Sequence, residues 1–537
     1  MNDSVRETGI LIIGAGFSGL AAATRLRREG NEDFLVLERG NEVGGTWRDN
    51  TYPGAACDVP SHLYSLSFAQ DFDWSRSFGT QPEIADYQRS VAVEEGLYPF
   101  IRFRTEMVDA QWDDAAGRWI VVTRELPHEL DDGRGRTTVT SKGGHAEKVF
   151  SGRRDGDDGA AEGETVTWSA RELVLGVGAL CEPRLPDIEG IEDFEGTIFH
   201  SARWDHDADL MGKRVAVIGT GASAIQIVPK IAPIVGHLDV YQRTAPYVIP
   251  RLDRNYFGWE RAALRNIPGL RKVVRAQDWF FREMQVPGLT RDERLMAPIK
   301  ATSTALLRMQ VRNRELREKL TPKHTIGCKR MLISNTYFPA IARDNVDLVT
   351  DPIQSVGAHS ITTADGTERP IDVLIVCTGF HVTDSPTFEL VHGRDGESLA
   401  DKWSREGMSA HKGTTINGFP NLAVLMGPAT GLGHSSMIYM IESQVNYFMD
   451  MLKTKRRHGA DVAEVSARAQ GEWNDWIRER LPETVWVTGC GSWYVDDHGN
   501  APAVWPSWTW KFRAKTKKFD ASSYDLRVAK PQVQPVG

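Results

Sequence analysis

Residues 9–30 read GILII, GAGFSG and LAAATRLRREG in succession: an apolar run, a glycine-rich turn and a helix-forming segment. Glycines at such a turn let the backbone approach a pyrophosphate, and the N-terminus of the following helix favours its negative charge. A second apolar run at Phe34–Leu37 makes the stretch a strand–helix–strand unit. Such a unit indicates a parallel sheet covered by helices.

A second unit of the same kind begins about two hundred residues later. Residues 214–231 read RVAVI, GTGASA and IQIVPKI, and Leu238–Tyr241 supplies the next strand. Ala224 stands where the first turn has its third glycine, and Pro229 should kink the helix or end it early. We therefore expect an α/β fold with two Rossmann-like dinucleotide-binding domains.

The residues after each second strand distinguish the two expected ligands. Glu38 ends the strand of the first unit, where a carboxylate can accept hydrogen bonds from a ribose diol and would repel a 2′-phosphate. This favours FAD or NAD. The second unit has no acid there, and Arg243 offers a planar donor fork suited to phosphate, which favours NADPH. A flavin reduced by NADPH must pass its electrons to an acceptor. A disulfide reductase would need two closely spaced cysteines, and the chain has none, so we expect oxygen to be the acceptor.

Composition excludes several classes of protein. The chain has 537 residues, which is too long for a single ordinary core. A net charge of −8 and a pI of about 6.0 argue against nucleic acid as a partner. The longest apolar runs, such as Ile10–Ile13, have the length of a strand, so we expect no integral membrane contact.

Five scattered cysteines, without a C-x-x-C pair, argue against a disulfide framework, a zinc site or a redox dithiol. The first residues lack the apolar core of a signal peptide. We therefore expect a cytoplasmic enzyme with reduced thiols and no metal site.

The pattern Phe194-x-Gly196-x-x-x-His200-x-x-x-Trp204 resembles the fingerprint of the type I Baeyer–Villiger monooxygenases, a class B flavoprotein monooxygenase family. The resemblance covers nearly the whole chain. It implies FAD and NADPH as cofactors, a small-molecule ketone and O2 as partners, and no required oligomer. The implied reaction inserts one oxygen atom beside the ketone carbonyl through a flavin peroxide, giving an ester or lactone.

The resemblance also implies a division of the chain. Residues 1–180 and 382–537 would form an FAD-binding domain, with an exposed polar insertion at about 127–164. Residues 181–381 would form an NADPH-binding domain, with a helical insertion at about 251–325.

Arg330 would supply the fixed positive charge that the reaction needs, with Asp58 as its carboxylate partner. His200 would act from a distance, near the domain junction. Lys329 would join Arg243 and Thr244 around the 2′-phosphate. The residues predicted to bind the cofactors are Gly14, Gly16, Phe17, Ser18, Gly19, Glu38, Arg39, Gly45, Thr46, Trp47, Asp58, Tyr64, Gly219, Thr220, Gly221, Ala222, Ser223, Arg243, Thr244, Lys329 and Trp493.

Two alternatives stay open at this point. A flavin monooxygenase that oxidises nitrogen or sulfur shares the cofactors, although Trp204 favours the ketone branch. A catalytically silent nucleotide-binding sensor would keep the fold, but it has no need of a cation such as Arg330.

Overall fold

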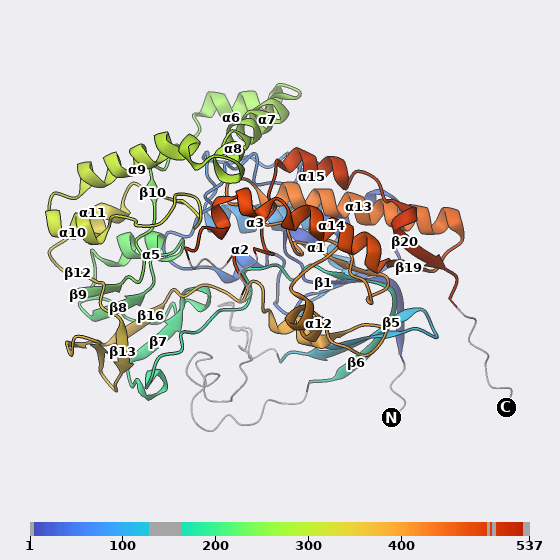
Figure 1. Cartoon of the computed structure of the whole chain (residues 1–537), viewed down its shortest axis with the longest axis horizontal. Coiled ribbons are helices and arrows are strands. Elements are labelled where there is room, and N and C mark those ends of the chain that lie inside the picture. The colour runs from blue at the N-terminus through green and yellow to red at the C-terminus, as the bar shows by residue number, and fades with distance from the viewer. Residues whose placement is uncertain (1–4, 128–162, 491–493, 497–500, 530–537) are drawn as a thin grey trace.

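The structure, a computed structural model, describes residues 5–127, 163–490, 494–496 and 501–529 (Figure 1). Its two largest sheets each contain one of the glycine-turn units. Both predicted units are therefore present, and the α/β fold with two Rossmann-like domains is confirmed. The predicted polar insertion falls almost wholly on residues 128–162, which lie outside the described ranges.

The larger sheet is built around the first unit. Its strands are β1 (Arg6–Ile13), β2 (Phe34–Leu37), β3 (Ile101–Arg102), β4 (Thr105–Asp113), β5 (Arg118–Glu125), β6 (Thr165–Leu175), β17 (Val391–His392) and β18 (Leu422–Val424). They lie in the order β17-β4-β5-β6-β1-β2-β3, with β18 paired to β6. β1 runs parallel to both β2 and β6, and Leu11 and Ile12 are fully buried on its two faces. Burial on both faces explains why this strand reads as one continuous apolar run.

Helices cover the larger sheet. They are α1 (Phe17–Arg28), α2 (Thr46–Asp49), α3 (Gln81–Glu94), α12 (Leu399–Glu406) and the long α13 (Met437–His458). α1 packs against α13, so the segment that follows the first glycine turn lies beside a helix more than four hundred residues away in the sequence. In the described ranges, no helix combines the length and the hydropathy that a membrane span requires.

The second sheet is parallel throughout. Its strands are β7 (Thr197–His200), β8 (Arg214–Ile218), β9 (His237–Tyr241), β12 (Val346–Val349) and β16 (Val373–Val376), in the order β12-β9-β8-β16-β7. Helices α5 (Ala224–Ile231) and α11 (Tyr337–Ile341) pack against each other beside it. α5 passes through Pro229 and ends two residues later, as expected of a helix that contains proline. A small antiparallel sheet of β13 (Ile353–Val356), β14 (Ser360–Thr363) and β15 (Glu368–Pro370) adjoins it.

A helical insertion lies between β10 (Val248–Ile249) and β11 (Leu332–Ile333), which pair with each other as a separate two-stranded sheet. It comprises α6 (Gly258–Asn266), α7 (Leu270–Glu283), α8 (Val286–Thr290), α9 (Ala297–Gln310) and α10 (Arg314–Lys319). Figure 1 places α6 and α7 at one edge of the molecule, far from β5 and β6. These helices fall within residues 251–325, where we expected a helical insertion.

The C-terminal part of the chain packs onto the larger sheet through α13. It contains α14 (Ala467–Arg478), α15 (Thr509–Lys515) and the antiparallel pair β19 (Val462–Val465) and β20 (Tyr524–Arg527). Three of its tryptophans, Trp473, Trp476 and Trp505, stack on one another with centroids 5.1–5.9 Å apart. These rings act as packing anchors.

The cysteines correct one prediction. Cys328 and Cys490 form a disulfide, with their Cα atoms 6.5 Å apart, whereas we expected reduced thiols. Cys57, Cys181 and Cys377 are free. The bonded pair is separated by 162 residues, and spacing along the chain carries no signal for such a distant contact.

Candidate active site

A cavity of about 430 Å³ lies at the first glycine turn. The predicted flavin-side residues converge on it from four separate segments. Those that line it are Gly14, Gly16, Phe17, Ser18, Glu38, Arg39, Gly45, Thr46, Trp47 and Tyr64. Gly14 has φ +97°, and a Cβ there would lie 2.8 Å from the carbonyl oxygen of Gly176. The turn therefore needs glycine for both its conformation and its close backbone contact.

Glu38 lies at the wall of this cavity and is buried. Its Oε2 accepts a hydrogen bond from the Ala15 amide at 2.8 Å, and its Oε1 accepts from the Gly40 amide at 2.8 Å and from Arg48 Nη1 at 2.7 Å. Arg48 also pairs with Asp49, so it connects two buried carboxylates. A carboxylate offers about four acceptor sites, which leaves Glu38 able to accept from a ribose diol.

Aromatic side chains form another part of the wall. Trp47 Nε1 donates to the Tyr64 hydroxyl at 2.9 Å, and the Phe17 and Tyr64 rings meet edge to face at 5.3 Å. Further lining residues that the sequence did not predict are Arg48, Met107, Met426, Met437, Ile438 and Ile441. They come from distant segments that only the folded sheet brings together.

Arg330 and Asp58 make the predicted contact. Arg330 Nε donates to Asp58 Oδ2 at 2.6 Å and Nη2 donates to Oδ1 at 2.8 Å, which is a bidentate pair. Nη1 donates to the Leu432 carbonyl at 3.1 Å. The side chains are 27% and 25% exposed, so the pair is fixed but still open on one side.

The charges of this pair sustain each other. Burial alone would raise the pKa of the Asp58 carboxyl, but the Arg330 guanidinium holds that pKa below its ordinary value. Burial alone would lower the pKa of Arg330, and Asp58 outweighs burial and raises it. Both groups therefore remain ionised over the working pH range.

Tyr64 connects the cavity to the arginine pair. Burial raises the pKa of its phenol, and the charges of Asp58 and Arg330 act on the same group. Tyr64 also lines the cavity at the first turn.

Arg282 is a second arginine beside this pair that the sequence did not predict. Its Nη2 donates to the Asp58 carbonyl at 3.0 Å, and burial lowers its pKa. It comes from α7 in the helical insertion, so its place at the site depends on how that insertion docks.

The second glycine turn repeats the backbone geometry of the first. Gly219 has φ +111°, and a Cβ there would lie 2.5 Å from the Cys377 carbonyl oxygen, whereas a Cβ on Gly221 would meet open space. The Thr220 hydroxyl donates to the Thr244 carbonyl at 3.3 Å, which fixes the turn against the end of β9. Ser223 is the N-cap residue of α5 and follows Ala222.

Lys329 and Arg243 gather beside this turn. Burial and the neighbouring charge of Arg243 lower the pKa of Lys329. Within the described ranges, neither cation has an ion pair with a carboxylate. Two adjacent cations without an acid are suited to hold a phosphate group.

The structure does not bring His200 to Arg330. His200 is buried at the end of β7, where its Nδ1 accepts from the Ala202 amide at 3.1 Å and its ring lies against Phe380. Burial and Arg203 lower the pKa of His200 to about 3, so the imidazole is neutral. Trp493 lies outside the described residues.

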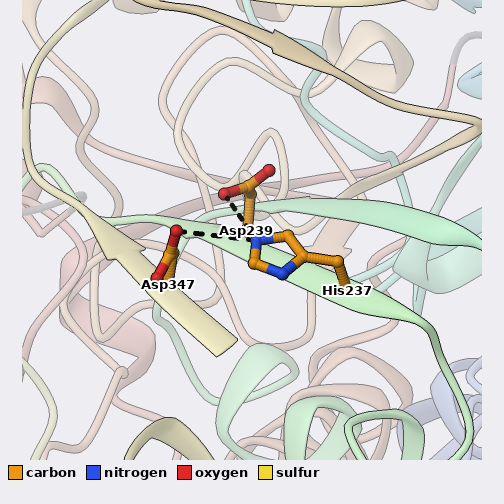
Figure 2. Close-up of side chains that lie close together, drawn as sticks. All are labelled: His237, Asp239 and Asp347. Carbon is orange, nitrogen blue, oxygen red and sulfur yellow. Dashed lines mark ion pairs between the residues drawn. The ribbon is translucent and has the colours of Figure 1, made fainter. Parts of the chain in front are cut away.

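Three potential metal ligands converge elsewhere, on β9 and β12 (Figure 2). His237 Nε2 lies 3.5 Å from Asp239 Oδ1 and 3.6 Å from Asp347 Oδ2. The same two oxygens already bind Arg369 Nη1, at 2.8 and 3.1 Å. Because Arg369 supplies the positive charge, this cluster is an ion-pair network and we assign no metal to it.

Comparisons with known proteins agree with this geometry. Residues 12–78 match a family model described as an NAD(P)-binding Rossmann-like domain, and residues 93–261 match a model described as L-lysine 6-monooxygenase/L-ornithine 5-monooxygenase. The crystal structure of OTEMO in complex with FAD and NADP aligns with a TM-score of 0.81 and 26% identity, covering 97% of this chain and 100% of that one.

Full-length relatives identify the family. A Baeyer–Villiger monooxygenase of Streptomyces coelicolor is 45% identical over 527 residues, which is 98% of this chain and 94% of the relative. A Baeyer–Villiger monooxygenase of Pseudomonas aeruginosa is 42% identical, covering 97% of this chain and 92% of the relative. With both glycine turns, the Arg330–Asp58 pair and identity at this level over nearly the whole length, the chain belongs to the Baeyer–Villiger monooxygenase family.

Proposed function

We propose that the chain is an FAD- and NADPH-dependent Baeyer–Villiger monooxygenase that inserts one oxygen atom from O2 beside a ketone carbonyl, giving an ester or lactone. The observation that carries this proposal is the bidentate Arg330–Asp58 pair, which holds a charged guanidinium in a fixed orientation. The family of the chain supports it.

The residues present fit both cofactors. The first turn, Glu38 and the aromatic wall would hold FAD, because the turn leads into the N-terminus of α1 and Glu38 can still accept from a ribose. The second turn, with Lys329 and Arg243, would hold the pyrophosphate and 2′-phosphate of NADPH. When bound, the flavin supplies the oxygen-transfer chemistry and NADPH supplies the hydride.

Arg330 would stabilise the negative charge that develops on the reacting oxygens. Its guanidinium is charged at any working pH, and Asp58 and the Leu432 carbonyl fix its orientation before the reaction begins. Preorganised charge of this kind is worth more in a closed site than in water. Asp58 acts as a positioning residue, since both of its oxygens are engaged by Arg330. His200 would act only through the second sheet.

The remaining expectations complete the proposal. Residues 1–180 and 382–537 would form the FAD-binding domain, and residues 181–381 the NADPH-binding domain with its helical insertion at about 251–325. The chain would work in the cytoplasm and would not require an oligomer. A tryptophan at position 493, Trp493, would border the nicotinamide and substrate pocket.

Arg330→Ala tests the proposal in the flavin-loaded enzyme. We expect NADPH still to reduce the flavin, while ester formation falls by about 10²- to 10³-fold, as for the loss of one preorganised charge. Arg330→Lys keeps the charge but loses the fork, and should give an intermediate rate. Arg343→Ala, which removes an exposed arginine in the turn after α11, is the matched control. Ester at wild-type levels from Arg330→Ala would remove Arg330 from the mechanism.

One rival activity has an observation in its favour. The match of residues 93–261 to a lysine/ornithine monooxygenase model favours oxidation of nitrogen. Incubating the enzyme with a ketone, a thioether and an amine, followed by mass spectrometry of the products, separates the two. An N-oxide or sulfoxide without any ester would favour oxidation of nitrogen or sulfur over insertion of oxygen into a ketone.

A further inference from the structure

Helix α7 is amphipathic with its polar face turned inward. Arg271, Arg275, Asp278 and Arg282 recur every three or four residues, so they share one face. That face lies on the protein: Arg271 Nη1 donates to the Gln70 carbonyl at 2.9 Å, and Arg275 Nη1 donates to the His62 carbonyl at 2.8 Å. An ordinary surface helix turns its apolar stripe toward the core.

The opposite face of α7 carries apolar side chains into solvent. Phe280 and Phe281 are 55% and 61% exposed, and Val273 and Met284 are exposed on the same face. The neighbouring helix α6 adds the exposed Trp259. We call this surface, made of Trp259, Val273, Phe280, Phe281 and Met284, the outer face. Exposed aromatic and aliphatic side chains gathered on two neighbouring helices are a feature of interaction sites.

The segment that contains the outer face is rich in basic residues. Residues 251–310 contain twelve Lys and Arg against six Asp and Glu, although the whole chain has a net charge of −8. Some of these cations are exposed and have no ion pair in the part of the chain that the structure describes: Lys272, Arg291, Arg294, Lys300 and Arg308. The charge of this region therefore favours an anionic partner.

We propose that the outer face docks on the surface of an anionic phospholipid bilayer. Aromatic side chains prefer the headgroup level of a membrane, and a helix of this kind inserts its apolar face at the boundary of the acyl chains. Each Lys or Arg of this segment adds attraction to anionic headgroups. A second copy fits less well, because a two-fold interface would place one basic surface against another.

The polar face of α7 explains how the helix can present apolar side chains and remain ordered. Its arginines donate hydrogen bonds to carbonyl groups between Asp58 and Gln70, and Trp279 on the inner side packs against the core and stacks on Tyr439. The outer face is thus left for a partner.

Vesicle flotation of the FAD-loaded enzyme tests this proposal. We expect binding to vesicles that contain phosphatidylglycerol to be at least tenfold tighter than to vesicles of phosphatidylcholine alone, and to weaken as salt rises. Phe280→Ser with Phe281→Ser should reduce binding at least tenfold. Lys272→Glu with Lys300→Glu should reduce binding to the anionic vesicles by a similar factor.

The controls change comparable residues elsewhere. Val93→Ser with Met211→Ser removes two apolar side chains of similar exposure, and Lys518→Glu reverses an exposed charge on the C-terminal part. All variants should keep wild-type NADPH oxidation, which shows that they fold. Equal vesicle binding by the wild type and the phenylalanine variant would overturn the proposal. So would a dimer in sedimentation that the phenylalanine variant loses while no variant binds vesicles.

Discussion

The two glycine turns share a backbone and differ in the side chains that follow it. Gly14 and Gly219 both have positive φ, and each lies so close to a neighbouring carbonyl that a Cβ would clash. After β2 the chain places the buried acid Glu38, whereas beside the end of β9 it places the cations Arg243 and Lys329. On the proposed function, the backbone would provide a site for a pyrophosphate in both units, and the residues beyond the strand would select the group on the ribose.

The turns also differ at their third small residue. A Cβ on Gly19 would lie 1.8 Å from the Gly14 carbonyl oxygen, so only glycine fits inside α1. In the second unit Ala224 takes this place, and α5 begins at Ala224 itself with Ser223 as its N-cap residue. The later start of the helix makes room for the extra methyl group.

Gly19→Ala should therefore give the largest effect. The added Cβ forces the turn apart, which should cost about 1–3 kcal/mol of stability and abolish FAD binding. Gly221→Ala is the matched control, because a Cβ there meets open space. Flavin content after purification and the melting temperature are the measurements. Normal flavin content in Gly19→Ala would show that the two turns tolerate the same residue.

Lys329→Ala and Arg243→Ala test the difference between the two turns at the cations of the second unit. Each removes one charged donor, which should weaken NADPH binding by about 1.5–3 kcal/mol, or roughly 10- to 150-fold, and leave NADH binding unchanged. The KM values for the two cofactors are the measurement. An equal loss for NADH would mean that the cations do not bind the 2′-phosphate.

Glu38→Gln tests the difference between the two turns at the acidic residue of the first unit. The amide keeps the shape but loses the charge that binds Arg48, so FAD affinity should fall by about tenfold while the KM for NADPH stays the same. Titration of the apoprotein with FAD measures this. A change in the KM for NADPH would argue that the two units are not independent.

The smallest effect concerns pH. Because burial and Arg243 lower the pKa of Lys329, this lysine loses its proton at a lower pH than an ordinary lysine. NADPH affinity should therefore decline as pH rises through that lowered pKa, and NADH affinity should not. Lys329→Arg should remove the decline, since arginine stays protonated. A decline that persists in this variant would have to come from another group.

Local sequence patterns predicted the helices and strands, whereas most contacts between distant residues became known only from the structure. β2 has the bounds Phe34–Leu37 that its apolar run indicated, because a run of four apolar residues between turns is typical of a buried strand. Arg330 and Asp58 are 272 residues apart, and the resemblance to a family pointed to their contact where spacing could not. Nothing local marked Arg282 as a neighbour of the site, since a single arginine on a helix has no distinguishing pattern, whereas Arg48 directly follows the predicted Trp47.

The disulfide between Cys328 and Cys490 keeps proteolytic fragments of the chain covalently linked. Cys328 is two residues from Arg330, and Cys490 belongs to the C-terminal part of the chain. The backbone between them is closed into a covalent ring. A protease cut anywhere inside that ring would leave the fragments attached, and they would separate on a denaturing gel only after a thiol reagent is added.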